Sequence, residues 1–133
     1  MDEPSVMGTE NALLAAALAP GETVMRNAAS EPHVQNLARM LESMGVEIGG
    51  IGSNELRVQG AERLAGTRFR IGPDHIEVGS FIALAAATGG ELRIKDSGPA
   101  DLRMTRLGFE RLGVQIEFDG SDTIVPAGQE LIV

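Results

Sequence analysis

An internal repeat is the feature that most constrains how this chain of 133 residues folds. Two segments of its first half, residues 21–27 and 41–48, recur in its second half as residues 90–96 and 109–116. Self-similarity at a fixed spacing indicates that one supersecondary unit occurs twice, and that a single copy does not bury its whole apolar surface alone. We therefore predict two copies of one unit.

Each half carries the signals of the same βαβαββ unit. The first strand of the unit is only partly present near residues 4–6 of the first half, and residues 68–71 are expected to form it in the second. In each half a proline begins an amphipathic surface helix, because proline suits the first turn of a helix. A turn rich in Gly, Ser, Asn and Asp then joins the last two strands into a hairpin. We predict an α/β (α+β) fold, with units over residues 1–66 and 67–133.

The helix that opens each unit is apolar on every side, over residues 13–19 and 81–87. Such a helix has to be buried all round. A four-stranded sheet buries one face of a helix, so further copies of the unit must cover the rest. These copies would come from a longer parent chain or from self-association, and we expect the isolated chain to form homo-oligomers.

Charge and composition exclude several classes of function. The net charge of -8 argues against nucleic acid or an anionic membrane as the main partner, because phosphate contacts need clustered Lys and Arg. Without cysteine the chain has no disulfide, thiolate metal site or cysteine nucleophile. The acidic N-terminus is unlike a signal peptide, and the longest apolar runs fall far short of the roughly 20 residues that span a bilayer. These features favour a cytoplasmic protein, and we expect neither a metal nor a cofactor.

Acidic residues at two helix starts are candidates for chemistry. Asp74 and Glu77 lie one helical turn apart on one face, as a catalytic carboxylate pair or a pair of metal ligands would. Acidic residues in a first turn more often complement the helix dipole. Glu31 precedes Pro32, and there too helix capping is the more frequent role. His33 and His75 are not part of a His or Cys cluster with metal-ligand spacing.

Several segments, taken in order, resemble the family of UDP-N-acetylglucosamine 1-carboxyvinyltransferases, the enolpyruvyl transferases of peptidoglycan synthesis. They are residues 4–11, which lead into an Ala-rich helix, and residues 27–32, 44–46 and 72–81. The resemblance covers essentially the whole chain. It implies an inside-out α/β barrel of six βαβαββ units in two domains, with this chain as the middle third. The first unit would end one domain, the second would begin the other, and residues 70–74 would cross between them.

The resemblance also implies an activity. The family moves the enolpyruvyl group of phosphoenolpyruvate onto the 3′-hydroxyl of UDP-N-acetylglucosamine and releases phosphate, which is the first committed step of peptidoglycan synthesis. The family's cysteine loop, its Lys-Asn pair, its Asp base and further phosphoenolpyruvate-binding arginines lie before or after this segment. We therefore expect no catalytic residue in this chain, and no activity from the chain alone.

The implied substrate contacts are Ser5, Val6, Met7 and Gly8, which match the family segment that contacts the diphosphate of the sugar nucleotide. A strand end followed by a helix start offers backbone N–H groups and a positive dipole end to phosphate. The family usually has glycine where this chain has Met7. The segments that contain Glu31, Asp74 and Glu77 match parts of the family that border the cleft or the hinge.

Two other interpretations stay open. The first is a related enzyme of the same fold, such as a 5-enolpyruvylshikimate-3-phosphate synthase or an RNA 3′-terminal phosphate cyclase. The acidic charge counts against the RNA enzyme. The second is a non-enzymatic, self-associating repeat module, which the surplus apolar helix surface favours.

Overall fold

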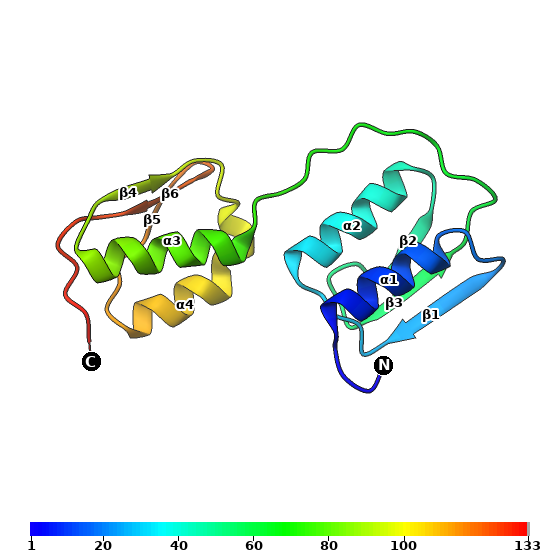
Figure 1. Cartoon of the computed structure of the whole chain (residues 1–133), viewed down its shortest axis with the longest axis horizontal. Coiled ribbons are helices and arrows are strands. Elements are labelled where there is room, and N and C mark those ends of the chain that lie inside the picture. Colours follow the sequence, from blue (N-terminus) through cyan, green and yellow to red (C-terminus); the bar gives the residue numbers. More distant parts are fainter. Residues whose placement is uncertain (133) are drawn as a thin grey trace. The chain divides into compact units, whose positions relative to one another are not determined.

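The computed structural model describes residues 1–132, which form two compact units, the first from Met1 to Gly72 and the second from Pro73 onward (Figure 1). The first unit contains α1 (Val6–Ala16), β1 (Glu22–Arg26), α2 (Pro32–Ser43), β2 (Glu47–Gly49) and β3 (Glu55–Gln59). The second unit contains α3 (His75–Thr88), β4 (Leu92–Ile94), a 3₁₀ turn η1 (Pro99–Leu102), α4 (Arg103–Arg111), β5 (Glu117–Asp119) and β6 (Asp122–Val125). The order helix, strand, helix, strand, strand is therefore the same in both.

Each unit has a three-stranded antiparallel sheet in which the last strand along the chain lies in the middle. The strand orders are β1-β3-β2 and β4-β6-β5. In the first sheet Val58 of β3 pairs with Thr23 of β1 on one side and Ile48 of β2 on the other. The predicted hairpins β2–β3 and β5–β6 are confirmed. The predicted fold class, α/β (α+β), is also confirmed.

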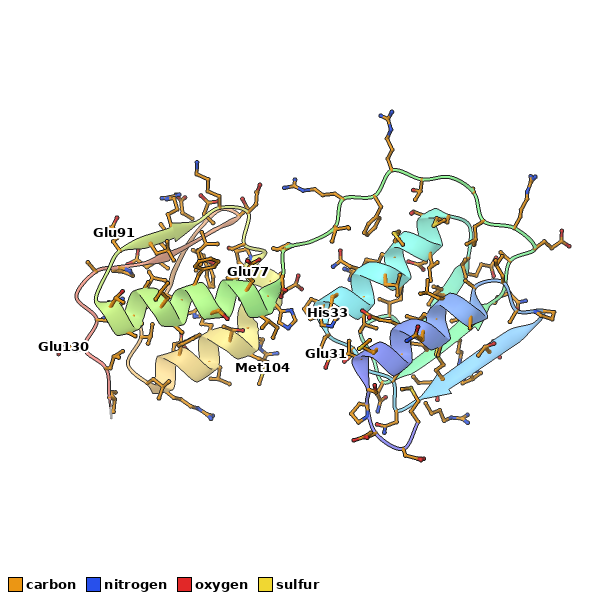
Figure 2. The ribbon with its side chains drawn as sticks, viewed as in Figure 1. Glu31, His33, Glu77, Glu91, Met104 and Glu130 are labelled. Carbon is orange, nitrogen blue, oxygen red and sulfur yellow. The ribbon has the colours of Figure 1, made fainter. Side chains whose placement is uncertain are left out.

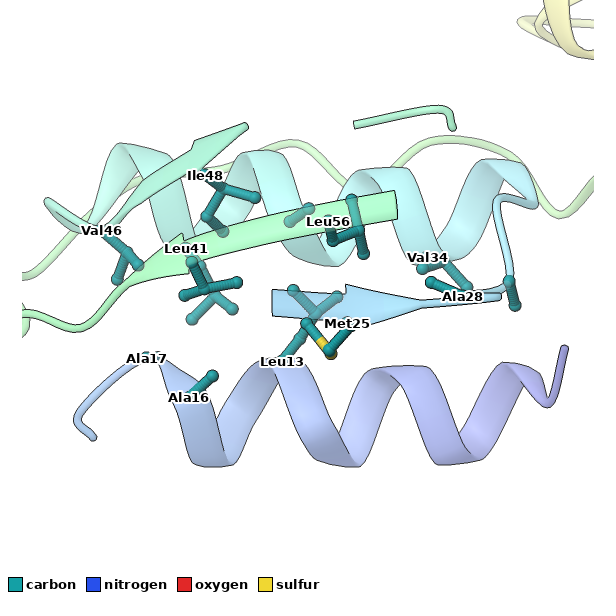
Figure 3. Packing of buried hydrophobic residues seen from close by; sticks show 13 residues of the cluster. Leu13, Ala16, Ala17, Met25, Ala28, Val34, Leu41, Val46, Ile48 and Leu56 are labelled. Atoms are coloured by element: carbon teal, nitrogen blue, oxygen red, sulfur yellow. The ribbon is translucent and has the colours of Figure 1, made fainter. Parts of the chain in front are cut away.

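The first core lies where α1 and α2 pack against one face of their sheet, as Figure 3 shows. Burial alternates along β3, where Leu56 and Val58 are buried while Arg57 between them is exposed. This alternation is expected of a sheet with one covered face and one solvated face. The buried residues of this core are Leu13, Ala16, Ala17, Met25, Ala28, Ala29, Val34, Ala38, Leu41, Val46, Ile48, Leu56 and Val58.

The second core is smaller. Its buried residues are Val78, Ile82, Ala85, Ala86, Leu102, Val114 and Val125, and α4 contributes none of them. Phe109 of α4 is only partly buried against this cluster, and Leu112, which follows α4, is exposed. The second unit therefore leaves more of its apolar surface in contact with water.

The two apolar helices are only partly buried within this chain, which leaves the surface that further copies of the unit are expected to cover. Leu13 and Ile82 are fully buried, yet Leu14 is 51% exposed on α1, and Phe81 and Leu84 are 45% and 57% exposed on α3. A three-stranded sheet and one neighbouring helix cover only the inward face of such a helix. Among the described residues, no helix is both long and apolar enough to cross a membrane.

The first strand predicted for each unit is not formed, so each unit is αβαββ. Residues 4 and 5 directly precede α1, which already begins at Val6, and residues 68–71 have no strand partner. Instead, the segment after β3 runs alongside α2 and forms hydrogen bonds with it. The N–H of Ala65 donates to the carbonyl of Met44 at 2.8 Å, and the N–H of Gly72 donates to Oδ1 of Asn36 at 3.1 Å. An extended sequence becomes a strand only where a sheet edge pairs with it.

Candidate anion site at the start of helix α1

Helix α1 begins at an uncharged, capped turn. Ser5 is the N-cap residue, and its Oγ accepts a hydrogen bond from the N–H of Gly8 at 3.1 Å. The first turn contains no acidic residue. Backbone N–H groups of a first helical turn lack partners within the helix, and the helix dipole gives this end a partial positive charge. The turn is therefore suited to an anion such as a phosphate group.

The other three predicted contacts differ in exposure. Val6 is half-buried against the first core, whereas Met7 is 71% exposed. Gly8 is half-buried, and a Cβ there would lie 2.9 Å from Cε of Met1 and 3.1 Å from Oγ of Ser5. The side chain of Met7 extends toward solvent, so methionine is accommodated where the family usually has glycine. Gly8 keeps the turn beside Ser5 uncrowded.

Thr9 connects this turn to the loop before α2. Its side chain is fully buried, and its hydroxyl donates to the carbonyl of Ser5 at 2.8 Å. The same hydroxyl accepts a hydrogen bond from the N–H of Ala29 at 2.9 Å. As a result, the starts of α1 and α2 lie at the same end of the first unit (Figure 1).

Glu31 lies at the start of α2, where Figure 2 labels it together with His33. It occupies the N-cap position but makes no side-chain capping hydrogen bond, so the capping role expected for it is wrong. Its Oε2 atom is buried and has no hydrogen-bond partner. A buried polar atom without a partner is costly, which makes this oxygen a candidate acceptor for an N–H or O–H group of a ligand.

Asp74 and Glu77 lie at the start of α3 in the second unit, and Figure 2 labels Glu77 there. Oδ1 of Asp74 accepts hydrogen bonds from the N–H groups of Ile76 and Glu77, at 2.8 and 3.3 Å. Asp74 is therefore the N-cap of α3, and its negative charge lies at the positive end of the helix dipole. A shallow surface depression beside this turn is lined by Asp74, Ile76, Glu77, Ser80, Phe81 and Leu84.

The two groups of candidates occupy equivalent positions in the two units. Counted from its N-cap, α1 has Gly8 where α3 has Glu77, and both N–H groups donate to the cap side chain. Unit one therefore begins with an uncharged turn, while unit two begins with two carboxylates. Like charges repel and opposite partial charges attract, so an anion is favoured at α1 and disfavoured at α3.

Clear pKa shifts occur on the sheets. Asp122 accepts a hydrogen bond from the N–H of Asp96 and forms an ion pair with Arg93 at 2.9 Å. These interactions hold the pKa of Asp122 below its usual value. Arg93 also pairs with Asp119 at 2.9 Å. Across residues 1–132, no group of three or more His, Cys, Asp or Glu side chains is placed to hold a metal ion.

The arrangement of elements matches the fold of a solved structure, and the sequence shows the family. The crystal structure of the enolpyruvyl transferase NikO from Streptomyces tendae matches this fold with a TM-score of 0.78 and 23% identity. The match covers 95% of this chain and 31% of that one. The sequence pattern of the family described as EPSP synthase (3-phosphoshikimate 1-carboxyvinyltransferase) matches residues 1–132. This chain belongs to that family.

Relatives within the family are identical to this chain at about half of its residues. A UDP-N-acetylglucosamine 1-carboxyvinyltransferase of Treponema denticola is 51% identical over 133 residues, which is 100% of this chain and 31% of that protein. One from Bradyrhizobium diazoefficiens is 54% identical over 131 residues, or 98% of this chain and 30% of that protein. The chain thus spans less than a third of the length of these relatives. The resemblance seen in the motifs is confirmed.

Sequence reasoning did not single out Thr9 and Ala29, although both lie within the segments that carried the resemblance. A signal for Thr9 was present in the two copies themselves. On the buried face of its first helix, the first copy has a threonine where the second has Val78. A hydroxyl at such a position requires a hydrogen-bond partner, and only the folded chain identifies it as Ala29.

Proposed function

We propose that this chain is the middle part of a UDP-N-acetylglucosamine 1-carboxyvinyltransferase. The single observation that carries the proposal is the identity of about half of all residues, over the whole chain, with proteins of that name. The first unit would end one domain of the parent enzyme, and the second would begin the other. Residues 70–74 would cross between these domains, with Asp74 and Glu77 close to the hinge or cleft.

In the parent enzyme, the enolpyruvyl group of phosphoenolpyruvate would pass to the 3′-hydroxyl of UDP-N-acetylglucosamine, with release of phosphate. Addition followed by elimination needs a proton donor for carbon, a base for the hydroxyl and cations for phosphate. This chain would supply none of these groups. Its contribution would be binding, through the first turn of α1, which offers N–H groups and a positive dipole end to the diphosphate.

The starts of α1 and α2 lie at one end of the first unit and would act on the same ligand. Ser5, Val6, Met7 and Gly8 would contact the diphosphate. Glu31, whose Oε2 atom is buried without a partner, would accept a hydrogen bond from an N–H or O–H group of the sugar nucleotide. The chain would therefore combine an anion site with an acceptor site. We also place it in the cytoplasm and in peptidoglycan synthesis, the setting in which this substrate is used.

The test is a titration of the ¹⁵N-labelled chain followed by NMR. UDP-N-acetylglucosamine is expected to shift the amide signals of Val6, Met7 and Gly8, and to leave those of Ile76 and Glu77 in place. Shikimate 3-phosphate should cause no such shifts. Shifts at α1 with shikimate 3-phosphate alone would favour a related enzyme of the same fold. A spectrum unchanged by both compounds would refute nucleotide binding by this chain.

A further inference from the structure

The hydroxyl of Thr9 acts on two backbone segments at once. It donates to the carbonyl of Ser5 at 2.8 Å and accepts from the N–H of Ala29 at 2.9 Å, and no part of the side chain is exposed. A threonine hydroxyl has one donor and two acceptor positions, and here both kinds are used by main-chain groups. Because Ala29 is itself only 3% exposed, water cannot readily replace this contact. The hydroxyl therefore fixes the distance between the first turn of α1 and the loop that leads to Glu31.

The second unit shows that the αβαββ arrangement does not require this hydroxyl. Val78 occupies the equivalent position in α3, is 5% exposed, and packs in the second core. The residues around it have the same roles as in α1, since Asp74 is the N-cap and Ile82 takes the place of Leu13. Valine and threonine have nearly the same shape. At this position the hydroxyl is thus present in unit one, whose first helix begins without carboxylates, and absent from unit two.

We propose that Thr9 is a positioning residue for the anion site. By holding the turn at Ser5 against Ala29, it presents the N–H groups of the first turn of α1 in a fixed orientation toward a diphosphate, next to Glu31. It does not touch the ligand. This inference rests on the proposed function, because the ligand is the sugar nucleotide of that proposal.

The experiment compares Thr9→Val and Thr9→Ser in the 133-residue chain, by NMR titration with UDP-N-acetylglucosamine. Serine keeps the hydroxyl, so T9S should bind with the affinity of the unaltered chain. Valine keeps the shape and loses both hydrogen bonds, so T9V should bind about tenfold more weakly, equivalent to ~1.4 kcal/mol. The amide signals of the first turn of α1 and of Ala29 should move in ligand-free T9V and not in T9S.

Two control variants separate positioning from general stability. Val46→Ala removes buried volume beyond the opposite end of α2, so it should lower the melting temperature without changing affinity. Val78→Thr places a hydroxyl at the equivalent position of unit two and should leave the titration of α1 unchanged. Equal affinities of T9V and the unaltered chain would overturn the inference, as would a loss in V46A as large as in T9V. If the unaltered chain binds no nucleotide, the proposed nucleotide binding by this chain is refuted. Unmoved first-turn signals in ligand-free T9V would then also refute positioning.

Discussion

Ser5 and Asp74 hold the same position in the two units, each as the N-cap of the unit's first helix. Ser5 accepts a hydrogen bond from the N–H three residues ahead at 3.1 Å, and Asp74 does so at 3.3 Å. Asp74 also accepts a hydrogen bond from the N–H of Ile76, so the two caps share one hydrogen bond and differ in charge. The first helix of unit one therefore begins with a turn that suits an anion. The first helix of unit two begins with a turn that already carries carboxylate side chains.

Removing either cap should destabilise its unit. We expect Ser5→Ala and Asp74→Ala each to lower the free energy of unfolding by about 1 kcal/mol, because an N-cap side chain satisfies otherwise unpaired N–H groups. Urea denaturation followed by circular dichroism measures the loss. Ser80→Ala, an exposed site on α3, is the control and should stay within about 0.5 kcal/mol. A cap variant as stable as S80A would contradict the assigned role.

The ion pairs of Arg93 should make the second unit sensitive to acid. The pKa of Asp122 is held below its usual value near 3.8, first by the N–H of Asp96 and then by Arg93. A lowered carboxyl pKa stabilises the fold above the unfolded-state value, and this contribution is lost as the pH falls through the lowered pKa.

Asp122→Asn should therefore be less stable than the unaltered chain at about pH 6 and should approach it at about pH 2.5. Urea midpoints across this range measure the difference. Glu117→Gln removes one negative charge from the same sheet and is the matched control. Parallel stability curves for D122N and the unaltered chain would show that the pair makes no pH-dependent contribution.

Two glycines of the segment that follows β3 should respond differently to alanine. A Cβ at Gly60 would overlap the carbonyl oxygen of Ala19, whereas nothing lies within 4 Å of one at Gly66. Gly60→Ala should lower the free energy of unfolding by about 1–3 kcal/mol or more, through overpacking. Gly66→Ala should be neutral or stabilise by up to about 1 kcal/mol, since it restricts the unfolded chain. Thermal unfolding measures both, and equal midpoints would contradict the close approach at Gly60.

The exposed apolar faces of α1 and α3 should drive self-association of the isolated chain. Leu14 and Leu84 are 51% and 57% exposed, and burying such side chains is worth roughly 25 cal/mol per Å² of apolar area. Static light scattering should give a mass above that of the monomer, and the double variant Leu14→Gln, Leu84→Gln should reduce it. A monomer that binds no apolar dye would argue against association.

The isolated chain should not catalyse enolpyruvyl transfer. It has no cysteine, and the acidic groups at its helix starts do not form a clamp for phosphate. With phosphoenolpyruvate and UDP-N-acetylglucosamine present, phosphate release should equal that of a blank without protein. Release above the blank, abolished by heat denaturation of the chain, would contradict this expectation.

The sequence alone predicted most of the elements that local signals define. Pro32 begins α2 as expected. Gly45 and Gly113 follow the second helix of each unit with φ values of 103° and 80°, a conformation that glycine adopts without strain. The two hairpins were predictable from the alternation of apolar and polar residues and from the turn residues, since both signals act between neighbours in the chain. The motifs sufficed for the family because their order along the chain is itself specific.

Tertiary structure decided what depends on partners distant in sequence. Residues 68–71 have the composition of a strand but run alongside α2 as irregular chain, because no sheet edge pairs with them. Glu31 stands where a cap is expected and makes no capping hydrogen bond, and its Oε2 atom is buried without a partner. The hydroxyl of Thr9 has its role only because folding brings Ala29, 20 residues away, within 2.9 Å. Sequence determines local conformation through adjacent residues, whereas the site depends on contacts that only the packed unit provides.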